Sequence, residues 1–294
     1  MSKKSIDWLI FIILAIIWGS SFILMKIGLD NHLTPYHIAA IRIVSAGLVL
    51  LPVAAKSIKK IPTNKLLLVF LSGFLGSLVP AFLFCIAEEG IDSSLAGTLN
   101  SLTPIFVIIT GALFFKRNTP LNKVIGIIIA FSGSVLLLLS KGHMQESQHL
   151  IYVAFVVLAT IFYGFNVNMV SKYLLNIPSL HIAAVALSLN AIPAFAVLLF
   201  TGFFSLPFHD PAVIKGSAAA VVLGVGGTAI ATILFYMLVK RASGIFAAMV
   251  TYGIPFVAIG WGIYFDEGFT LNQFFALLVI LLGVYLTNRK MDSG

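Results

Sequence analysis

The sequence predicts an all-α integral membrane protein with ten transmembrane helices, arranged as two inverted five-helix repeats with both termini in the cytoplasm. Three observations predict this fold. They are roughly ten long apolar stretches, an alternation of charge between the segments that connect them, and a similarity between the two halves of the chain. Composition agrees, because 60% of the residues are hydrophobic and only 10% are charged, against about 25% in soluble domains.

Most of the apolar stretches approach the ~20 residues that a helix needs to cross about 30 Å of hydrocarbon. The predicted helices cover residues 8–28, 36–55, 66–87, 94–115, 121–140, 150–170, 180–200, 216–238, 244–265 and 271–288. The first stretch follows two lysines, as a signal peptide does. It continues to about Gly28 without an Ala-x-Ala-like cleavage site, so we expect it to be retained as the first helix.

Basic residues gather at the termini and in every second connection. These segments hold Lys3, Lys4, Lys56, Lys59, Lys60, Lys65, Lys116, Arg117, Lys123, Lys172, Lys240, Arg241, Arg289 and Lys290, with only Asp7 and Asp292 as acids. The alternate connections hold the acidic residues Asp30, Glu88, Glu89, Asp92, Glu146, Asp210, Asp266 and Glu267. Since positive loops stay inside, this pattern predicts a multi-pass protein of the cytoplasmic (inner) membrane with both ends in the cytoplasm.

The chain resembles itself when it is shifted by 151 residues. Matched positions include Gly73 with Gly224, Gly76 with Gly227, Phe84 with Phe235 and Pro104 with Pro255. The loop charges change sign between the halves, as where Glu89 aligns with Lys240. A five-helix unit inserts upside down relative to its copy, so such a reversal indicates inverted repeats with a substrate site near the midplane. We therefore predict one repeat over residues 1–141 and a second over residues 150–290.

Short motifs at ordered spacings resemble a known family. They are Trp18-Gly19-Ser20-Ser21-Phe22, Arg42 in the second stretch, Ala96-Gly97-Thr98-Leu99-Asn100-Ser101-Leu102-Thr103-Pro104, Leu234-Phe235-Tyr236 and the turn Asp266-Glu267. This set is similar to the EamA family of the drug/metabolite transporter superfamily. The resemblance implies two inverted five-helix halves and export of small metabolites such as amino acids. The family often has one acidic residue after the fourth helix and another after the ninth. Here Lys116-Arg117 replaces the first of these, so only Glu267, after the ninth helix, remains.

Polar and aromatic groups inside apolar helices are candidates for a transport pathway, because each costs free energy in lipid. The predicted pathway residues are Trp18, Ser20, Ser21, Arg42, Thr98, Asn100, Ser101, Tyr163, Asn166 and Tyr252. Packing between helices is the alternative role for the two serines. Pro104 and Pro255 are predicted to kink their helices and to act as gates or hinges, because an interior proline frees a backbone carbonyl.

Arg42 is the most informative single position, because a charge below the membrane surface needs a partner. We expect that partner to be an external carboxylate such as Glu267, Glu89 or Asp30, which would make a gate, or the carboxylate of a substrate. The sequence does not decide between these two roles.

The sequence predicts a secondary carrier that works by alternating access without ATP and exports a small metabolite such as an amino acid. It shows no phosphate-binding loop, paired-carboxylate site or His/Cys cluster, so we predict no enzyme activity, no cofactor and no metal. The predicted partners are a small-molecule substrate and the lipid bilayer, with no nucleic acid, and the protein is expected to be a monomer or weak oligomer. The coupling ion stays open. The alternatives are a carrier that imports or exchanges another small metabolite, and a membrane scaffold that transports nothing.

Overall fold

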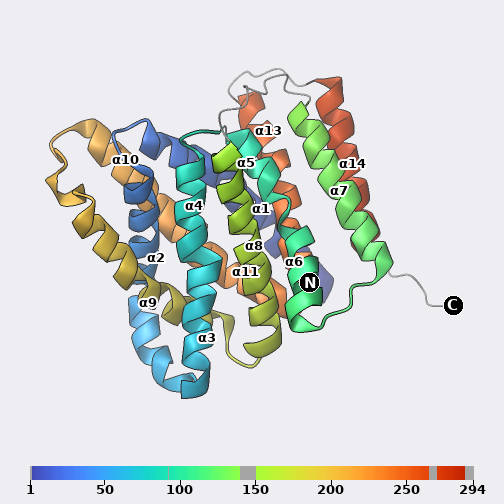
Figure 1. Ribbon diagram of the computed structural model, residues 1–294, viewed down its shortest axis with the longest axis horizontal. Helices are drawn as coiled ribbons and strands as arrows, with labels where there is room; N and C mark the ends of the chain where they lie inside the picture. The colour runs from blue at the N-terminus through green and yellow to red at the C-terminus, as the bar shows by residue number, and fades with distance from the viewer. Residues whose placement is uncertain (1, 92, 140–149, 265–269, 289–294) are drawn as a thin grey trace.

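The computed structural model describes the chain except for residues 1, 92, 140–149, 265–269 and 289–294, and every regular element in the described part is helical (Figure 1). The helices are α1 (Lys3–Leu29), α2 (Pro35–Ser57), α3 (Thr63–Gly73), α4 (Val79–Ala87), α5 (Ser93–Asn100), α6 (Thr103–Phe115), α7 (Leu121–Leu139), α8 (Leu150–Tyr173), α9 (Ser179–Phe200), α10 (Pro211–Val222), α11 (Ala231–Arg241), α12 (Gly244–Ala248), α13 (Ile254–Tyr264) and α14 (Leu271–Asn288).

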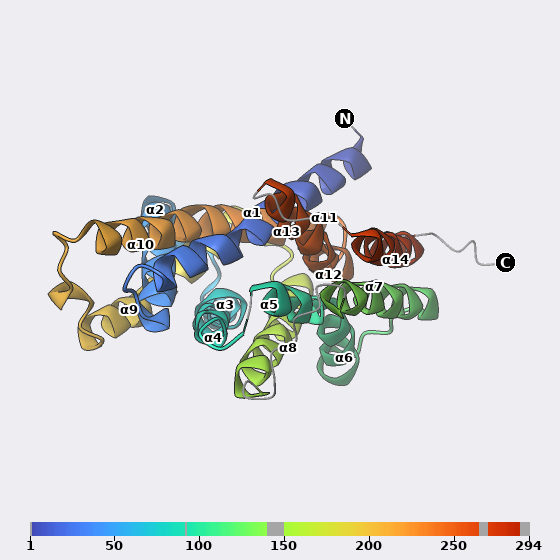
Figure 2. The ribbon, with the colours of Figure 1, turned by 90° about the horizontal axis from the view of Figure 1, so that it is seen from above.

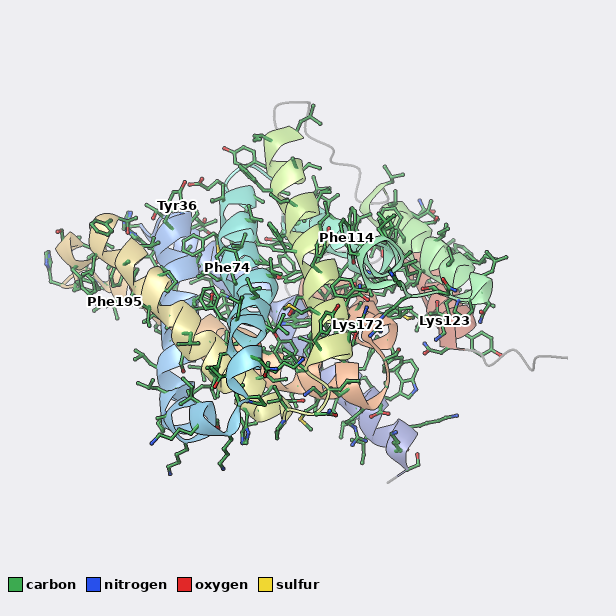
Figure 3. The ribbon with its side chains drawn as sticks, turned by 60° about the horizontal axis from the view of Figure 1, so that its bottom comes forward. Tyr36, Phe74, Phe114, Lys123, Lys172 and Phe195 are labelled. Carbon is green, nitrogen blue, oxygen red and sulfur yellow. The ribbon has the colours of Figure 1, made fainter. Side chains whose placement is uncertain are left out.

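Eight helical rods of the described chain are long and apolar enough to cross a membrane. Three of them join two α-helices end to end, namely Thr63–Ala87 with α3 and α4, Leu95–Phe115 with α5 and α6, and Pro211–Arg241 with α10 and α11. Two shorter apolar helices, Leu121–Leu137 and Gly244–Val257, occupy the places of the predicted fifth and ninth crossings. Large apolar side chains such as Phe114 and Phe195 are exposed on the outside of the bundle, as lipid requires (Figure 3).

The helices begin where the sequence supplies caps. Thr34 accepts a hydrogen bond from the backbone N–H of His37, and Pro35 follows in the first turn of α2. Asp210 accepts from the N–H of Ala212 in the same way, with Pro211 as the first residue of α10. These caps satisfy N–H groups that have no partner inside the helix.

The two halves of the chain interlock. In Figure 2, α1 lies in one layer with α10, α11 and α13 of the second half, and α8 lies in the opposite layer with α3, α4 and α6 of the first. Thus each half contributes its first helix to the layer that the other half builds. Two further pairs join the halves directly, because α2 packs along α9 and α7 packs along α14.

Small residues allow these pairs to approach closely. A Cβ atom added to Gly283 in α14 would lie 2.3 Å from the backbone nitrogen of Ala130 in α7. A Cβ atom added to Gly47 in α2 would lie 2.8 Å from the carbonyl oxygen of Leu187 in α9. Neither position has room for a side chain, so glycine sets the distance between the backbones of the two helices.

Candidate functional site

A cavity lies where the two layers meet. The cavity has a volume of about 80 Å³, which is room for several waters or a compact small molecule. Its walls come from both halves and are formed by Trp18, Ser21, Phe22, Met25, Arg42, Gly76, Ser77, Phe84, Asn100, Thr103, Tyr163, Asn166, Gly227, Thr228, Thr232, Phe235, Tyr236, Ala248, Thr251 and Ile254. This mixture of aromatic faces with hydroxyl and amide groups is typical of a small-molecule site.

Two π-helical segments shape opposite walls of the cavity. The first is η2 (Phe74–Leu78), between α3 and α4, and the second is η4 (Leu223–Ile230), between α10 and α11. A π turn leaves backbone groups without their usual helical partners, and such turns are frequent at functional sites. In η4, the carbonyl oxygen of Gly227 accepts a hydrogen bond from Nε1 of Trp18 at 3.1 Å. This bond links α1 to the second half of the chain at the edge of the cavity.

Two predicted crossings are broken at the cavity. The fourth stretch divides into α5 and α6, and in the ninth the 3₁₀ segment η5 (Met249–Gly253) separates α12 from α13. Pro104 and Pro255 are each the second residue of a new helix and do not lie in a helix interior, which corrects the expected placement. Proline is well tolerated there because the first N–H groups of a helix lack intrahelical partners. Thr103 and Ile254, the first residues of α6 and α13, both line the cavity.

Arg42 is the charged residue among those that line the cavity. Its Nε atom donates a hydrogen bond to Oγ1 of Thr228 in η4 at 2.6 Å. Asp30 and Glu89, two of the expected partners, form no ion pair with it, and Glu267 lies outside the described residues. The partner found is a hydroxyl group, which holds the guanidinium in place without neutralising its charge. The cavity therefore keeps a positive charge, and no acidic side chain is among its described lining residues.

Six of the ten predicted pathway residues meet at the cavity, namely Trp18, Ser21, Arg42, Asn100, Tyr163 and Asn166. Tyr163 and Asn166 lie three residues apart in α8, so they share a helix face. Asn100 also supports the helix break, because its carbonyl oxygen accepts a hydrogen bond from Oγ1 of Thr103 at 2.8 Å.

The other four predicted pathway residues do not line the cavity. Ser20 is next to Ser21 in α1 and is turned to a different helix face. Thr98 and Ser101 are buried in packing around the break that follows α5. Tyr252 is 1% exposed, and its hydroxyl donates to the carbonyl oxygen of Ile127 in α7 at 3.0 Å, so it joins helices.

Several polar lining residues were absent from the sequence prediction. They are Ser77, Thr103, Thr228, Thr232, Tyr236 and Thr251. The alignment of the two halves indicates some of these residues. A shift of 151 residues pairs Ser77 with Thr228, and it pairs the predicted pathway residue Asn100 with Thr251. The same shift pairs Gly76 with Gly227 and Phe84 with Phe235, which also line the cavity. Thr232 and Tyr236 follow Thr228 along the same face at intervals of four residues.

Comparisons with known proteins point to transport. Residues 6–139 and 150–289 each match the sequence model of the EamA-like transporter family. An uncharacterized transporter of Archaeoglobus fulgidus is 26% identical over 96% of this chain and 99% of its own length. The uncharacterized inner membrane transporter YedA of Escherichia coli is 26% identical over 94% of this chain and 91% of its own.

A third relative has a name that specifies a cargo. A protein of Salmonella typhimurium named "probable amino-acid metabolite efflux pump" is 27% identical over 52% of this chain and 50% of its own length. Among solved structures, one crystallised protein superposes with a TM-score of 0.74 over 97% of this chain and 96% of its own. At 16% identity, this last similarity shows the fold alone.

Proposed function

The chain belongs to the EamA-like transporter family, and we propose that it is a secondary carrier that exports a small, amino-acid-like metabolite by alternating access. In this proposal ten helices cross the inner membrane as two inverted repeats, over residues 1–141 and 150–290. Both termini lie in the cytoplasm, as the charge pattern favours. Inverted repeats of this kind place the substrate site near the midplane, between the halves.

The observation that carries the proposal is the cavity between the two layers, whose opposite walls use matched positions of the two halves. Gly76 and Ser77 from one half face the cavity, and so do their counterparts Gly227 and Thr228 from the other. When equivalent elements surround one site, a rocking motion of the layers can open either end while the site stays in place. A membrane scaffold without transport would have no use for a polar cavity at this position.

The broken helices supply a place for that motion. The rods Leu95–Phe115 and Gly244–Val257 depart from α-helical geometry between α5 and α6 and at η5, so each rod can bend at that point. Pro104 and Pro255 mark these breaks, and a role as hinges stays part of the proposal.

Transport by purified protein in liposomes tests the proposal. Liposomes loaded with the twenty standard amino acids should release one or a few of them faster than protein-free liposomes, without ATP, as measured by mass spectrometry of the outside medium. An inverted gradient then separates export from import, because a strict exporter in oriented vesicles should favour one direction. If the folded protein releases no compound from this mixture or from a cell extract, the scaffold alternative is correct.

A further inference from the structure

A second pocket lies one helical turn from the cavity, along α1 and α4. Met25 and Phe84 line the cavity, whereas Lys26, the residue after Met25, and Glu88, four positions after Phe84, line the second pocket. The backbone N–H of Glu88 donates to the carbonyl oxygen of Phe84, which shows the one-turn spacing directly. Phe84 packs with Phe22 at a ring distance of 6.3 Å and with Tyr163 at 6.2 Å. These three rings form an aromatic part of the cavity wall.

Glu88 is the unusual group in this second pocket. It follows the last residue of the rod Thr63–Ala87 and caps α4. Its Oε2 atom accepts a hydrogen bond from Oγ of Ser93 at 3.4 Å, whereas its Oε1 atom is buried and has no partner among the described residues. A carboxylate oxygen without solvent or a donor is costly when charged but much less so when the group is protonated.

The surroundings of Glu88 set its charge. Burial raises the pKa of Glu88 to about 8, although Ser93, Arg42 and Lys26 act in the opposite direction. Arg42 on α2 and Lys26 on α1 act on Glu88 through their charge without an ion pair to it, while Lys26 and the acids Asp30 and Glu89 line the same pocket. Glu88 is therefore mostly neutral at pH 7 and becomes charged as the pH rises through about 8.

Arg42 lines the cavity and has hydrogen-bond donors that no described residue uses. Thr228 occupies its Nε atom, and no described residue accepts a hydrogen bond from its two Nη atoms. A planar guanidinium with a free edge matches a carboxylate, which takes two parallel hydrogen bonds. On the basis of the proposed carrier function, we propose that Arg42 binds an acidic group of the substrate in the cavity, and that Glu88 competes with this group for Arg42.

Competition for one guanidinium links substrate binding to a proton. When a substrate carboxylate neutralises Arg42, Glu88 loses a favourable charge, so its pKa rises and it holds its proton more tightly. By linkage, protonation of Glu88 must in turn favour substrate binding. Affinity for the acid should therefore fall as the pH rises through about 8, by at most tenfold per pH unit if one proton is involved.

Matched pairs of acids and amides test the acidic contact. Liposomes containing the full-length protein are loaded with L-leucine and L-leucinamide, L-threonine and L-threoninamide, lactate and lactamide, and succinate and succinamide. The protein should release an acid at least about tenfold faster than its amide, which corresponds to the loss of one hydrogen bond to a charged group. The variant Arg42→Gln should lose this preference. Arg117→Gln, in which the lost guanidinium donates to the carbonyl oxygen of Ser171 outside the cavity, should keep it.

Neighbouring glutamates test the competition. Release of the preferred acid is measured at pH 6.5 and pH 8.5 on both sides of the membrane. The unchanged protein and Glu89→Gln should release less at the higher pH, by up to roughly fourfold if one proton with a pKa of about 8 is coupled. Glu88→Gln should make the two rates nearly equal, because the competing charge is gone. Glu89 is exposed and Glu88 is half-buried, so the two substitutions remove the same group from different surroundings.

The outcomes separate this inference from the carrier function. Equal release of acids and amides, or an acid preference that survives Arg42→Gln, would show a carrier without the proposed contact. A pH response that survives Glu88→Gln would remove Glu88 from the mechanism. If Arg42→Gln does not yield folded protein, Arg42→Lys is used in its place. This variant should lower release of the acid but not of the amide, because lysine keeps the positive charge but lacks the planar guanidinium that donates two parallel hydrogen bonds. Release of none of these acids by an unchanged protein that does release another compound of the cell extract would overturn the acidic contact and leave the carrier function standing.

Discussion

Arg42 on α2 donates a hydrogen bond from Nε to Oγ1 of Thr228 on η4 over 2.6 Å, and 186 positions of sequence separate the two residues. The first half of the chain thus supplies the charge in the cavity, and the second half orients it. Thr228 lies in the π-helical segment η4 and lines the cavity. The bond consequently offers a direct test of how the two halves cooperate.

Replacing Thr228 by valine should lower transport while the protein still folds. Valine has nearly the same shape but no hydroxyl, so the guanidinium loses the acceptor that orients it. Hydrogen bonds to charged groups contribute about 1.5–3 kcal/mol, which predicts a fall of roughly tenfold or more in the initial rate of release from liposomes. Thr228→Ser keeps the hydroxyl and should stay near the original rate. Equal rates for Val and Ser would mean that Arg42 needs no such orientation.

The indole of Trp18 should matter for transport through its hydrogen bond to η4. Trp18→Phe keeps an aromatic ring against Phe235 but removes the Nε1 donor that bonds the carbonyl oxygen of Gly227. We expect release to fall several-fold, in line with about 1 kcal/mol for a neutral hydrogen bond. Trp8→Phe, at a position of the same helix that is 39% exposed, is the matched control and should have little effect. The prediction is wrong if both substitutions change the rate equally.

Gly283 should be essential for the packing of α7 against α14. Alanine would place its Cβ atom 2.3 Å from the nitrogen of Ala130 and 2.5 Å from the carbonyl oxygen of Gly126, so the two backbones must separate. Overpacking of this kind costs about 1–3 kcal/mol, and the midpoint of thermal unfolding in detergent should fall by several degrees. Gly260→Ala, with no atom within 4 Å of the new Cβ, should leave the midpoint nearly unchanged. A stable Gly283→Ala protein would refute this account of the pair.

The proposed orientation can be tested with reporter fusions. A reporter placed after Lys60 or after Arg241 should lie in the cytoplasm, because both positions end segments rich in basic residues. A reporter placed after Asp30 or after Asp210 should lie outside. Phosphatase and fluorescence activity distinguish the two compartments in living cells. Opposite sides for Lys60 and Arg241 would rule out ten crossings with this arrangement.

The roles of single residues were harder to predict than the class of fold. Ser20 and Ser21 are identical in type and adjacent in sequence, yet only Ser21 lines the cavity. Tyr252 and Thr251 differ in the same way, since Thr251 lines the cavity and Tyr252 joins η5 to α7. In a soluble helix the apolar face would indicate which side is buried. Here lipid and protein interior are both apolar, so the pattern of hydrophobic residues does not distinguish the face toward the cavity from the face toward the membrane.

By itself, the sequence determined that this is a helical membrane protein of the transporter type, because apolar length, loop charge and ordered motifs are local properties of the chain. Only the tertiary structure decided that the third and eighth predicted crossings contain π-helical segments, that the fourth and ninth are broken, and that Thr228 is the partner of Arg42. The pairing of Arg42 with Thr228 joins residues 186 positions apart, which no local pattern of the sequence can reveal. Which side chains meet in a cavity follows from how the layers pack, and no local pattern records that packing.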